Sequence, residues 1–224
     1  MIAKVSCYFD QTIDDKINNF RIVTFSHQMF NETNSDCKVV VIGDSVVGKT
    51  SLLNQYNLKR FQQTTDATIG ASFICATEQT SNGPVTLHIW DTAGQEKYRS
   101  LVPMYSRSAV AAIVVVDVTM MSSYEHIQDW INVIKCGYSP KCKIYIVANK
   151  MDLEPVIPLT SLVKFAQDNG YMFFKTSALD YATVAPLFHQ IAEDIALKRK
   201  KNPDEQAICS VSSIDEAEPK NSCC

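Results

Sequence analysis

The segment Gly43-Asp44-Ser45-Val46-Val47-Gly48-Lys49-Thr50 decides how this chain folds. It matches G-x-x-x-x-G-K-[ST], the pattern of a phosphate-binding loop. The preceding run CKVVVI, residues 37–42, is apolar and β-branched and predicts a buried strand, whereas residues 50–56 contain no Gly or Pro and can begin a helix. A strand, loop and helix in this order direct backbone N–H groups and the positive end of a helix dipole to one place. An ordinary glycine-rich turn is the alternative, and the flanking elements favour the phosphate loop.

Two side chains of this loop have predictable roles. Lys49 would reach the β- and γ-phosphates of a nucleotide as a point charge, and the Thr50 hydroxyl would bind Mg²⁺. Glycine is needed where the backbone approaches oxygen atoms too closely for a Cβ. The sequence therefore predicts that the chain binds a nucleotide.

Length and composition restrict the remaining possibilities. A chain of 224 residues suits one domain of about 160 to 180 residues with extensions. A formal net charge of −3 argues against a general nucleic-acid-binding protein. The 8 cysteines show no paired zinc spacing, and we expect reduced thiols in the cytosol. The longest apolar run, residues 109–116, is too short to span a bilayer, and the N-terminus has no continuous apolar region typical of a secretory signal.

Strand and helix patterns alternate after the loop. Further strands are predicted at residues 73–78, 85–90, 109–116, 143–148 and 171–175, with helices at residues 124–136 and 159–168 and a final helix that follows residues 176–178 and ends at about residue 201. This alternation indicates an α/β fold with a mostly parallel sheet covered on both faces. In such folds the ligand lies beyond the carboxyl ends of the strands.

Four motifs then occur in a specific order: GDSVVGKT at 43–50, Thr68, DTAGQE at 91–96 and NKMD at 149–152, with TSA at 176–178. Together they resemble the small GTPases of the Ras superfamily over residues 37 to about 200. The resemblance implies a P-loop NTPase fold, a Ras-like three-layer sandwich with a six-stranded, mostly parallel sheet. It also implies GTP and GDP as nucleotides, with Mg²⁺ as cofactor.

The resemblance assigns the base-binding residues. Asp152 would accept two hydrogen bonds from guanine N1 and N2, which adenine cannot donate as a pair. Asn149 would contact the guanine edge, the stem of Lys150 would lie along the ring, and the Ala178 N–H would reach guanine O6. Phe61 would pack on the other side of the base, the alternative being an ordinary core aromatic. The full predicted nucleotide-binding set is Asp44, Ser45, Val46, Val47, Gly48, Lys49, Thr50, Ser51, Phe61, Thr68, Gly94, Asn149, Lys150, Asp152, Ser177, Ala178 and Leu179.

The resemblance to small GTPases also implies a reaction, the hydrolysis of GTP to GDP and phosphate. Thr50 and Thr68 would hold Mg²⁺ with Asp91 in support through water, Gly94 would contact the γ-phosphate, and Gln95 would orient the attacking water. The expected catalytic residues are thus Gln95, Lys49, Thr68 and Gly94. Hydrolysis should be slow without an activating protein, since no arginine is evidently placed to act in cis. A scaffold that binds GTP without hydrolysing it and a P-loop ATPase or kinase are the alternatives; Thr68 with Gln95 argues against the first, and Asp152 against the second.

Within the superfamily, IGASF at 69–73, LHIW at 87–90, KYRS at 97–100 and YSRSA at 105–109 resemble Rab proteins, and TIGASF with SLVPMY looks most like the early-endosomal branch. Phe73, Trp90 and Tyr105 match the three aromatics that Rab effectors contact, with core packing as the alternative for each ring. Ser106 and Ser108 replace the usual Tyr and Gly, and Leu179 replaces the usual Lys.

The chain is predicted to have three parts. Residues 1–36 form an extension without an assigned role, either a partner-binding arm or a segment upstream of a translation start at Met29. Residues 37–201 form the GTPase domain, and residues 202–224 form a polar, acidic tail expected to be disordered. The run KRKK at 198–201 complements the helix dipole or contacts a membrane surface.

The tail ends in Cys223 and Cys224, for which the Rab resemblance implies two geranylgeranyl groups. Two lipid chains give stable anchoring where one gives marginal binding. We expect a monomer that cycles between the cytosol and the cytoplasmic face of membranes. The expected membrane is that of early endosomes or endocytic vesicles. The implied partners are an exchange factor, a GTPase-activating protein, effectors, a prenylation escort and a GDP-dissociation inhibitor.

Overall fold

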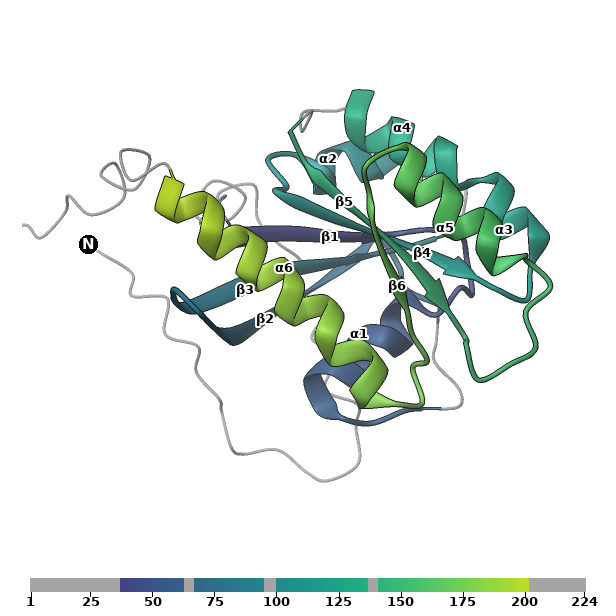
Figure 1. Ribbon diagram of the computed structural model, residues 1–224, viewed down its shortest axis with the longest axis horizontal. Coiled ribbons are helices and arrows are strands. Elements are labelled where there is room, and N and C mark those ends of the chain that lie inside the picture. The colour runs from purple at the N-terminus through teal and green to yellow at the C-terminus, as the bar shows by residue number, and fades with distance from the viewer. Residues whose placement is uncertain (1–36, 63–66, 95–99, 137–140, 202–224) are drawn as a thin grey trace, which may run out of the picture.

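The computed structural model describes residues 37–62, 67–94, 100–136 and 141–201. Over these ranges the chain forms a three-layer α/β sandwich (Figure 1). The strands are β1 (Lys38–Ile42), β2 (Ala71–Thr80), β3 (Gly83–Thr92), β4 (Ala111–Asp117), β5 (Lys143–Asn149) and β6 (Met172–Lys175). The helices are α1 (Lys49–Leu58), α2 (Val102–Ser106), α3 (Met121–Glu125), α4 (Ile127–Cys136), α5 (Leu159–Asp168) and α6 (Tyr181–Lys201).

The six strands form one sheet in the order β2-β3-β1-β4-β5-β6. Only β2 and β3 pair antiparallel within the described residues, and the other four pairs are parallel. Because β1, β3, β4, β5 and β6 run in the same direction, the loops after them meet at one edge of the sheet. The predicted fold is therefore confirmed, and the described residues of the predicted motifs that follow strands lie at this edge.

The sequence explains why the sheet is covered on both faces. Strands β1 and β4 are buried along their whole length and consist almost entirely of β-branched and small apolar residues, as expected for parallel strands between two helix layers. One core cluster joins β1, β3 and β4 to α1 and α6, and the second joins the opposite face to α2, α4 and α5. Figure 1 shows α1 and α6 on one side of the sheet and α2 to α5 on the other.

One helical prediction needs correction, and one helix was not predicted. The helix predicted at residues 124–136 is two helices, α3 and α4, that meet at His126. The sequence analysis did not predict α2, a helix of 5 residues with proline in its first turn, because so short a segment shows no helical period. Helix α5 has the predicted bounds, residues 159–168. Within the described residues, no helix is both long and apolar enough to span a membrane.

Candidate functional site: a pocket at the carboxyl ends of the strands

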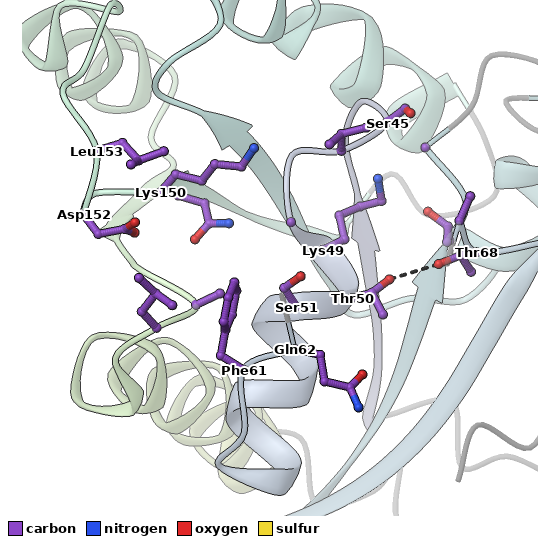
Figure 2. Close-up of a pocket in the computed structure, with 18 residues that line it drawn as sticks. Ser45, Lys49, Thr50, Ser51, Phe61, Gln62, Thr68, Lys150, Asp152 and Leu153 are labelled. Carbon is purple, nitrogen blue, oxygen red and sulfur yellow. Dashed lines mark hydrogen bonds between the residues drawn. The ribbon is translucent and has the colours of Figure 1, made fainter. Parts of the chain in front are cut away.

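A pocket of about 540 Å³ opens at the sheet edge where the parallel strands end. Figure 2 shows Phe61, Lys150 and Asp152 toward one end of it, Thr50 and Thr68 toward the other, and Lys49 between them. Fourteen of the predicted site residues line its wall, from loops that are distant in sequence: Ser45, Val46, Gly48, Lys49, Thr50, Ser51, Phe61, Thr68, Gly94, Asn149, Lys150, Asp152, Ala178 and Leu179.

The phosphate loop lies between the end of β1 and the start of α1. Gly48 has φ +95°, and a Cβ there would meet the Asn149 Nδ2 at 2.5 Å, so both the backbone conformation and the close packing require glycine. Helix α1 starts at Lys49, and its free N–H groups therefore face the pocket. The loop thus presents backbone donors and the positive end of a helix at one wall.

The Lys49 ammonium lies over this loop. Its Nζ donates to the carbonyl oxygens of Gly43 at 2.9 Å and of Asp44 at 2.6 Å. Burial lowers the pKa of Lys49 to about 8, and the carboxylates of Asp91 and Asp44 act in the opposite direction. At neutral pH the side chain is therefore mostly charged. A Cβ at Gly94 would overlap this ammonium and the Asp44 carbonyl, which shows how closely the segment after β3 approaches the loop.

A second cluster of oxygen atoms lies beside Lys49. The Thr50 Oγ1 donates to the Asp91 Oδ2 at 2.6 Å and is 2.9 Å from the Thr68 Oγ1. The Asp91 carboxylate is buried, and its second oxygen, Oδ1, has no hydrogen-bond partner within the described residues. Burial raises the pKa of Asp91 to about 6, against the opposing effects of the Thr50 hydroxyl and the Lys49 charge. Two hydroxyls and a carboxylate with a spare oxygen fit the hard oxygen ligands that Mg²⁺ prefers.

Hydrogen bonds between side chains fix the opposite end of the pocket. Asn149, at the end of β5, donates from Nδ2 to the Val47 carbonyl at 2.9 Å and accepts at Oδ1 from the Thr176 hydroxyl at 3.0 Å. The Ser177 hydroxyl donates to the Asp152 Oδ1. The Asp152 carboxylate, the predicted guanine acceptor, is thus held in place by the TSA loop.

Lys150 is fixed by an ion pair with Asp117 at the end of β4, where Nζ and Oδ2 are 2.5 Å apart. Asp117 is 1% exposed. Burial opposes its ionisation, but hydrogen bonds from Lys150 and Thr119 outweigh this effect and lower its pKa. With the ammonium tied to Asp117, the aliphatic stem of Lys150 lines the pocket.

Phe61 lies in the pocket wall and is 43% exposed. The alternative of a buried core aromatic therefore does not apply to it. Leu179, which replaces the usual Lys, also lines the pocket and is 52% exposed. Both positions would place apolar atoms beside a bound ring.

Several predicted residues lie behind the pocket wall or beyond the described residues. Val47 and Ser177 are bonded to the pocket residues Asn149 and Asp152, and Asp91 is bonded to Thr50. Gln95, Cys223 and Cys224 lie outside the described residues, so their roles stay predictions. The pocket is also lined by four residues that were not predicted, each adjacent to a predicted one: Gln62, Ala67, Thr92 and Leu153. The supporting residues Asp117 and Thr176 were not predicted either.

The three predicted effector-contact aromatics form a row. The Phe73 and Trp90 ring centroids are 5.2 Å apart, and the Trp90 and Tyr105 rings stack at 6.1 Å. Trp90 is buried, at 4% exposed, so the core-packing interpretation holds for much of its ring. Phe73 and Tyr105 are half-buried, and they leave part of the row accessible. Of the departures from the Rab pattern, Ser106 is buried and bonds to the Pro103 carbonyl, whereas Ser108 is exposed with φ +60°.

Comparisons with known proteins agree with this geometry. Residues 38–197 match the family model described as "Ras family". The Ras-related protein Rab-2B of Dictyostelium discoideum is 38% identical over 170 residues, 74% of this chain and 83% of the relative. RABF2b of Arabidopsis thaliana is 34% identical over 191 residues, 84% of this chain and 95% of the relative. Rab-5B of Plasmodium falciparum is 36% identical over 186 residues, 82% and 90% respectively. The chain therefore belongs to the Ras family of small GTPases, the enzymes that hydrolyse GTP, and is a Rab-type member of it.

Proposed function

We propose that this GTPase is a Rab-type switch that binds GTP, GDP and Mg²⁺ in the pocket at the sheet edge and recruits effectors to an endocytic membrane in its GTP state. The observation that supports this most strongly is that one pocket has two matched ends. Lys49, Thr50 and Thr68 lie at the phosphate end, and Asn149 and Asp152 lie at the base end. A guanine nucleotide is complementary to both ends, because its phosphates are negatively charged and its base carries hydrogen-bond donors.

At the base end, the Asp152 carboxylate would accept the guanine N1 and N2 hydrogens, while the stem of Lys150 and the Phe61 ring would cover the two faces of the base. This role of Asp152 is supported by the hydrogen bond that its Oδ1 accepts from the Ser177 hydroxyl, because the bond fixes the orientation of the carboxylate. A ligand without that donor pair would leave a desolvated carboxylate unpaired, and this difference gives the selectivity against adenine.

At the phosphate end, we assign Lys49 and the loop N–H groups to the charge of the β- and γ-phosphates. Thr50 and Thr68 would hold Mg²⁺, with Asp91 behind them. When bound, the ion would neutralise phosphate charge. Gly94 would contact the γ-phosphate through its N–H, and Gln95 would orient the attacking water. Since Thr68 and Gly94 would contact the γ-phosphate side, their segments should order with GTP and relax with GDP.

We also propose partners and a membrane location for this GTPase. We infer an exchange factor, a GTPase-activating protein, effectors at Phe73, Trp90 and Tyr105, a prenylation escort and a GDP-dissociation inhibitor. Membrane attachment would come from lipids on Cys223 and Cys224. Relatives that are named Rab5 and Rab-5B support an early-endosomal membrane. Localisation of the tagged chain beside endocytic markers, and fractionation of the Cys223→Ser/Cys224→Ser variant, test this part.

The test of the nucleotide assignment is a swap of base preference. Asp152→Asn should lose affinity for GTP by about a hundredfold and gain affinity for xanthosine triphosphate, because the amide can donate to the C2 oxygen of xanthine. Fluorescence titration with both nucleotides measures it. Asp168→Asn, the same change at the end of α5, is the matched control. Unchanged GTP affinity in Asp152→Asn would refute the assignment.

Hydrolysis is tested separately by single-turnover measurements with GTP and ATP. Gln95→Leu should bind GTP like the parent and lose most of the hydrolysis stimulated by an activating protein, because only the orientation of water is removed. Stimulated hydrolysis at the parental rate in this variant would exclude Gln95 as the water-positioning residue.

A further inference from the structure

The side chain of Asp44 points away from the nucleotide pocket, although its backbone forms part of the phosphate loop. Its carboxylate accepts a hydrogen bond from the Trp130 indole, with Nε1 and Oδ1 2.8 Å apart, and lies 2.7 Å from the His126 Nδ1 through Oδ2. Asp44 is absent from the residues that line the pocket. The Asp44 carboxylate therefore faces α3 and α4 rather than a ligand.

The backbone of the same residue is at the centre of the phosphate end. The Asp44 carbonyl accepts from the Lys49 Nζ at 2.6 Å, and it is one of the atoms that a Cβ at Gly94 would strike. Any shift of Asp44 would thus move the Lys49 ammonium and the Gly94 segment together. One residue joins the groups we assign to the phosphates to the helices on the sheet's second face.

The partners of Asp44 are firmly held. Trp130 is 3% exposed and packs in the core cluster with Ile127, Ile131 and Ile134 of the same helix. His126 caps α3 through its N–H, which donates to the Ser122 carbonyl at 3.1 Å, and its carbonyl accepts from the Trp130 N–H at 3.1 Å. The Trp130 indole and the His126 backbone therefore belong to one rigid unit, whereas the His126 side chain is 47% exposed.

The phosphate loop needs such an attachment because it contains a strained residue. Val46, two positions after Asp44, has φ +64°, a left-handed conformation that is unfavourable for a β-branched side chain. Its side chain is 79% exposed, so packing contributes little to holding it there. Strained backbone of this kind persists only where the surrounding structure determines it. The bonds of Asp44 on one side and the Asn149 bond to the Val47 carbonyl on the other supply that restraint.

We propose that Asp44 is a positioning residue for nucleotide retention: its carboxylate, bonded to Trp130 and His126, ties the phosphate loop to α4 and sets the rate at which bound GDP leaves. This inference rests on the proposed function, in which the pocket holds a guanine nucleotide. The competing view is that a carboxylate near phosphate groups repels them. The two views predict opposite effects when the charge is removed.

The experiment measures release of a fluorescent GDP analogue from the full-length chain into excess unlabelled GDP at fixed Mg²⁺. Asp44→Ala loses both bonds, and release should be about tenfold faster, which corresponds to about 1.4 kcal/mol. Asp44→Asn can still accept from the Trp130 indole through its amide oxygen and keeps a polar group beside the His126 ring, so its release rate should stay within about threefold of the parental rate. Repulsion would instead make both variants slower.

Two further variants keep the test independent of folding. His126→Ala removes an exposed partner and should accelerate release about two- to threefold. Gln128→Ala, an exposed change at the start of α4 whose side chain bonds only to Asn132 among the described contacts, is the control and should release at the parental rate. A purely structural defect would reduce the loaded fraction, whereas the proposal requires faster release from the fraction that is loaded.

A double-mutant cycle completes the design. Trp130→Phe removes the indole N–H and keeps an aromatic ring, and Asp44→Ala/Trp130→Phe should release GDP no faster than the faster single variant, because both remove the same bond. Parental release in Asp44→Ala, additive effects in the double variant, or Asp44→Asn as fast as Asp44→Ala would each overturn the inference. Failure of the parent chain to retain guanine nucleotide would instead overturn the proposed function.

Discussion

The base end and the phosphate end of the pocket are built in different ways. At the base end, side chains are fixed by other side chains: Asn149 by Thr176, Asp152 by Ser177 and Lys150 by Asp117. At the phosphate end, the Thr50 hydroxyl is also bonded to side chains, those of Asp91 and Thr68, but the ammonium of Lys49 is held by backbone carbonyl oxygens. The positions of the base-end side chains are therefore determined by residues at the ends of neighbouring strands, whereas the position of the Lys49 ammonium depends on the backbone conformation of the phosphate loop. Selectivity and retention should respond to different substitutions.

The largest effect should come from Lys49→Met at the phosphate end. Loss of a buried cation that we assign to two phosphates should weaken GTP and GDP binding by at least about a hundredfold. Lys59→Met makes the same change just beyond the other end of α1, where the ammonium lies 4.8 Å from the Tyr181 ring centroid. Isothermal titration with both variants measures the difference. A small effect of Lys49→Met would mean that loop N–H groups alone hold the phosphates.

Thr176→Val tests the hydrogen-bonded side chains at the base end. It removes the hydroxyl that fixes the Asn149 Oδ1 in a fully buried position. We expect GTP affinity to fall about tenfold and the free energy of unfolding to fall by about 1 to 2 kcal/mol. Thr86→Val, an exposed change on β3 whose hydroxyl faces Thr77, is the control for the loss of a threonine pair. Unchanged affinity with lowered stability would show that Asn149 does not need this support to meet the base.

The phosphate end should depend more on pH than the base end. Burial raises the pKa of Asp91 to about 6, so its carboxylate is ionised above that pH and takes up a proton as the pH falls through it. Mg²⁺ affinity of the GDP complex should therefore drop about fourfold between pH 7 and pH 5.5 through this group. Since the nucleotide phosphate titrates as well, Asp91→Asn is the reference, and the effect is the difference between the two profiles. Parallel profiles would exclude Asp91 from metal binding.

The smallest effect should come from Val46→Gly in the phosphate loop. Glycine adopts φ near +64° without the steric cost of a β-branched residue, although it loses more backbone entropy on folding. The balance should raise the free energy of unfolding by about 0.5 to 1 kcal/mol, with Val46→Ala between the two. Thermal unfolding at equal nucleotide loading measures it. A fall in stability would show that the Val46 side chain contributes more than its exposure indicates.

The sequence predicted the fold well where structure follows from local patterns. Every strand of the sheet was expected within a few residues, because β1 and β4 are continuous buried runs with clear turn residues between elements. Helix α2 could not be predicted because 5 residues are too few to show a helical period. The break between α3 and α4 could not be predicted because it is a single residue, His126, that does not interrupt the helical spacing of the apolar residues. Both features depend on packing against the sheet rather than on local preference.

The same distinction applies to the site. Fourteen of the pocket-lining residues were predicted because they belong to motifs or positions that match the family pattern, and the four that were not predicted are each adjacent to a predicted residue in sequence. The residues that support the pocket were not predicted, because they become neighbours only through the sheet: Asp117 stands opposite Asn149 in the register of β4 and β5. The anchoring of Asp44 by Trp130 likewise joins residues 86 positions apart. To predict such supporting contacts, one must know the order of the strands and how the helices pack on the sheet.

The pairing of β2 with β3 has a further consequence. The last bond of this hairpin runs from the Ala93 N–H to the Gly70 carbonyl at 2.8 Å. Thr68 lies two residues before that bond and Gly94 one residue after it, so the two segments we assign to the γ-phosphate are fastened to each other. The two segments would then respond to a third phosphate together rather than independently. A protein that contacted either segment would therefore detect the same change, and β2, which contains Phe73, would transmit that change to the protein surface.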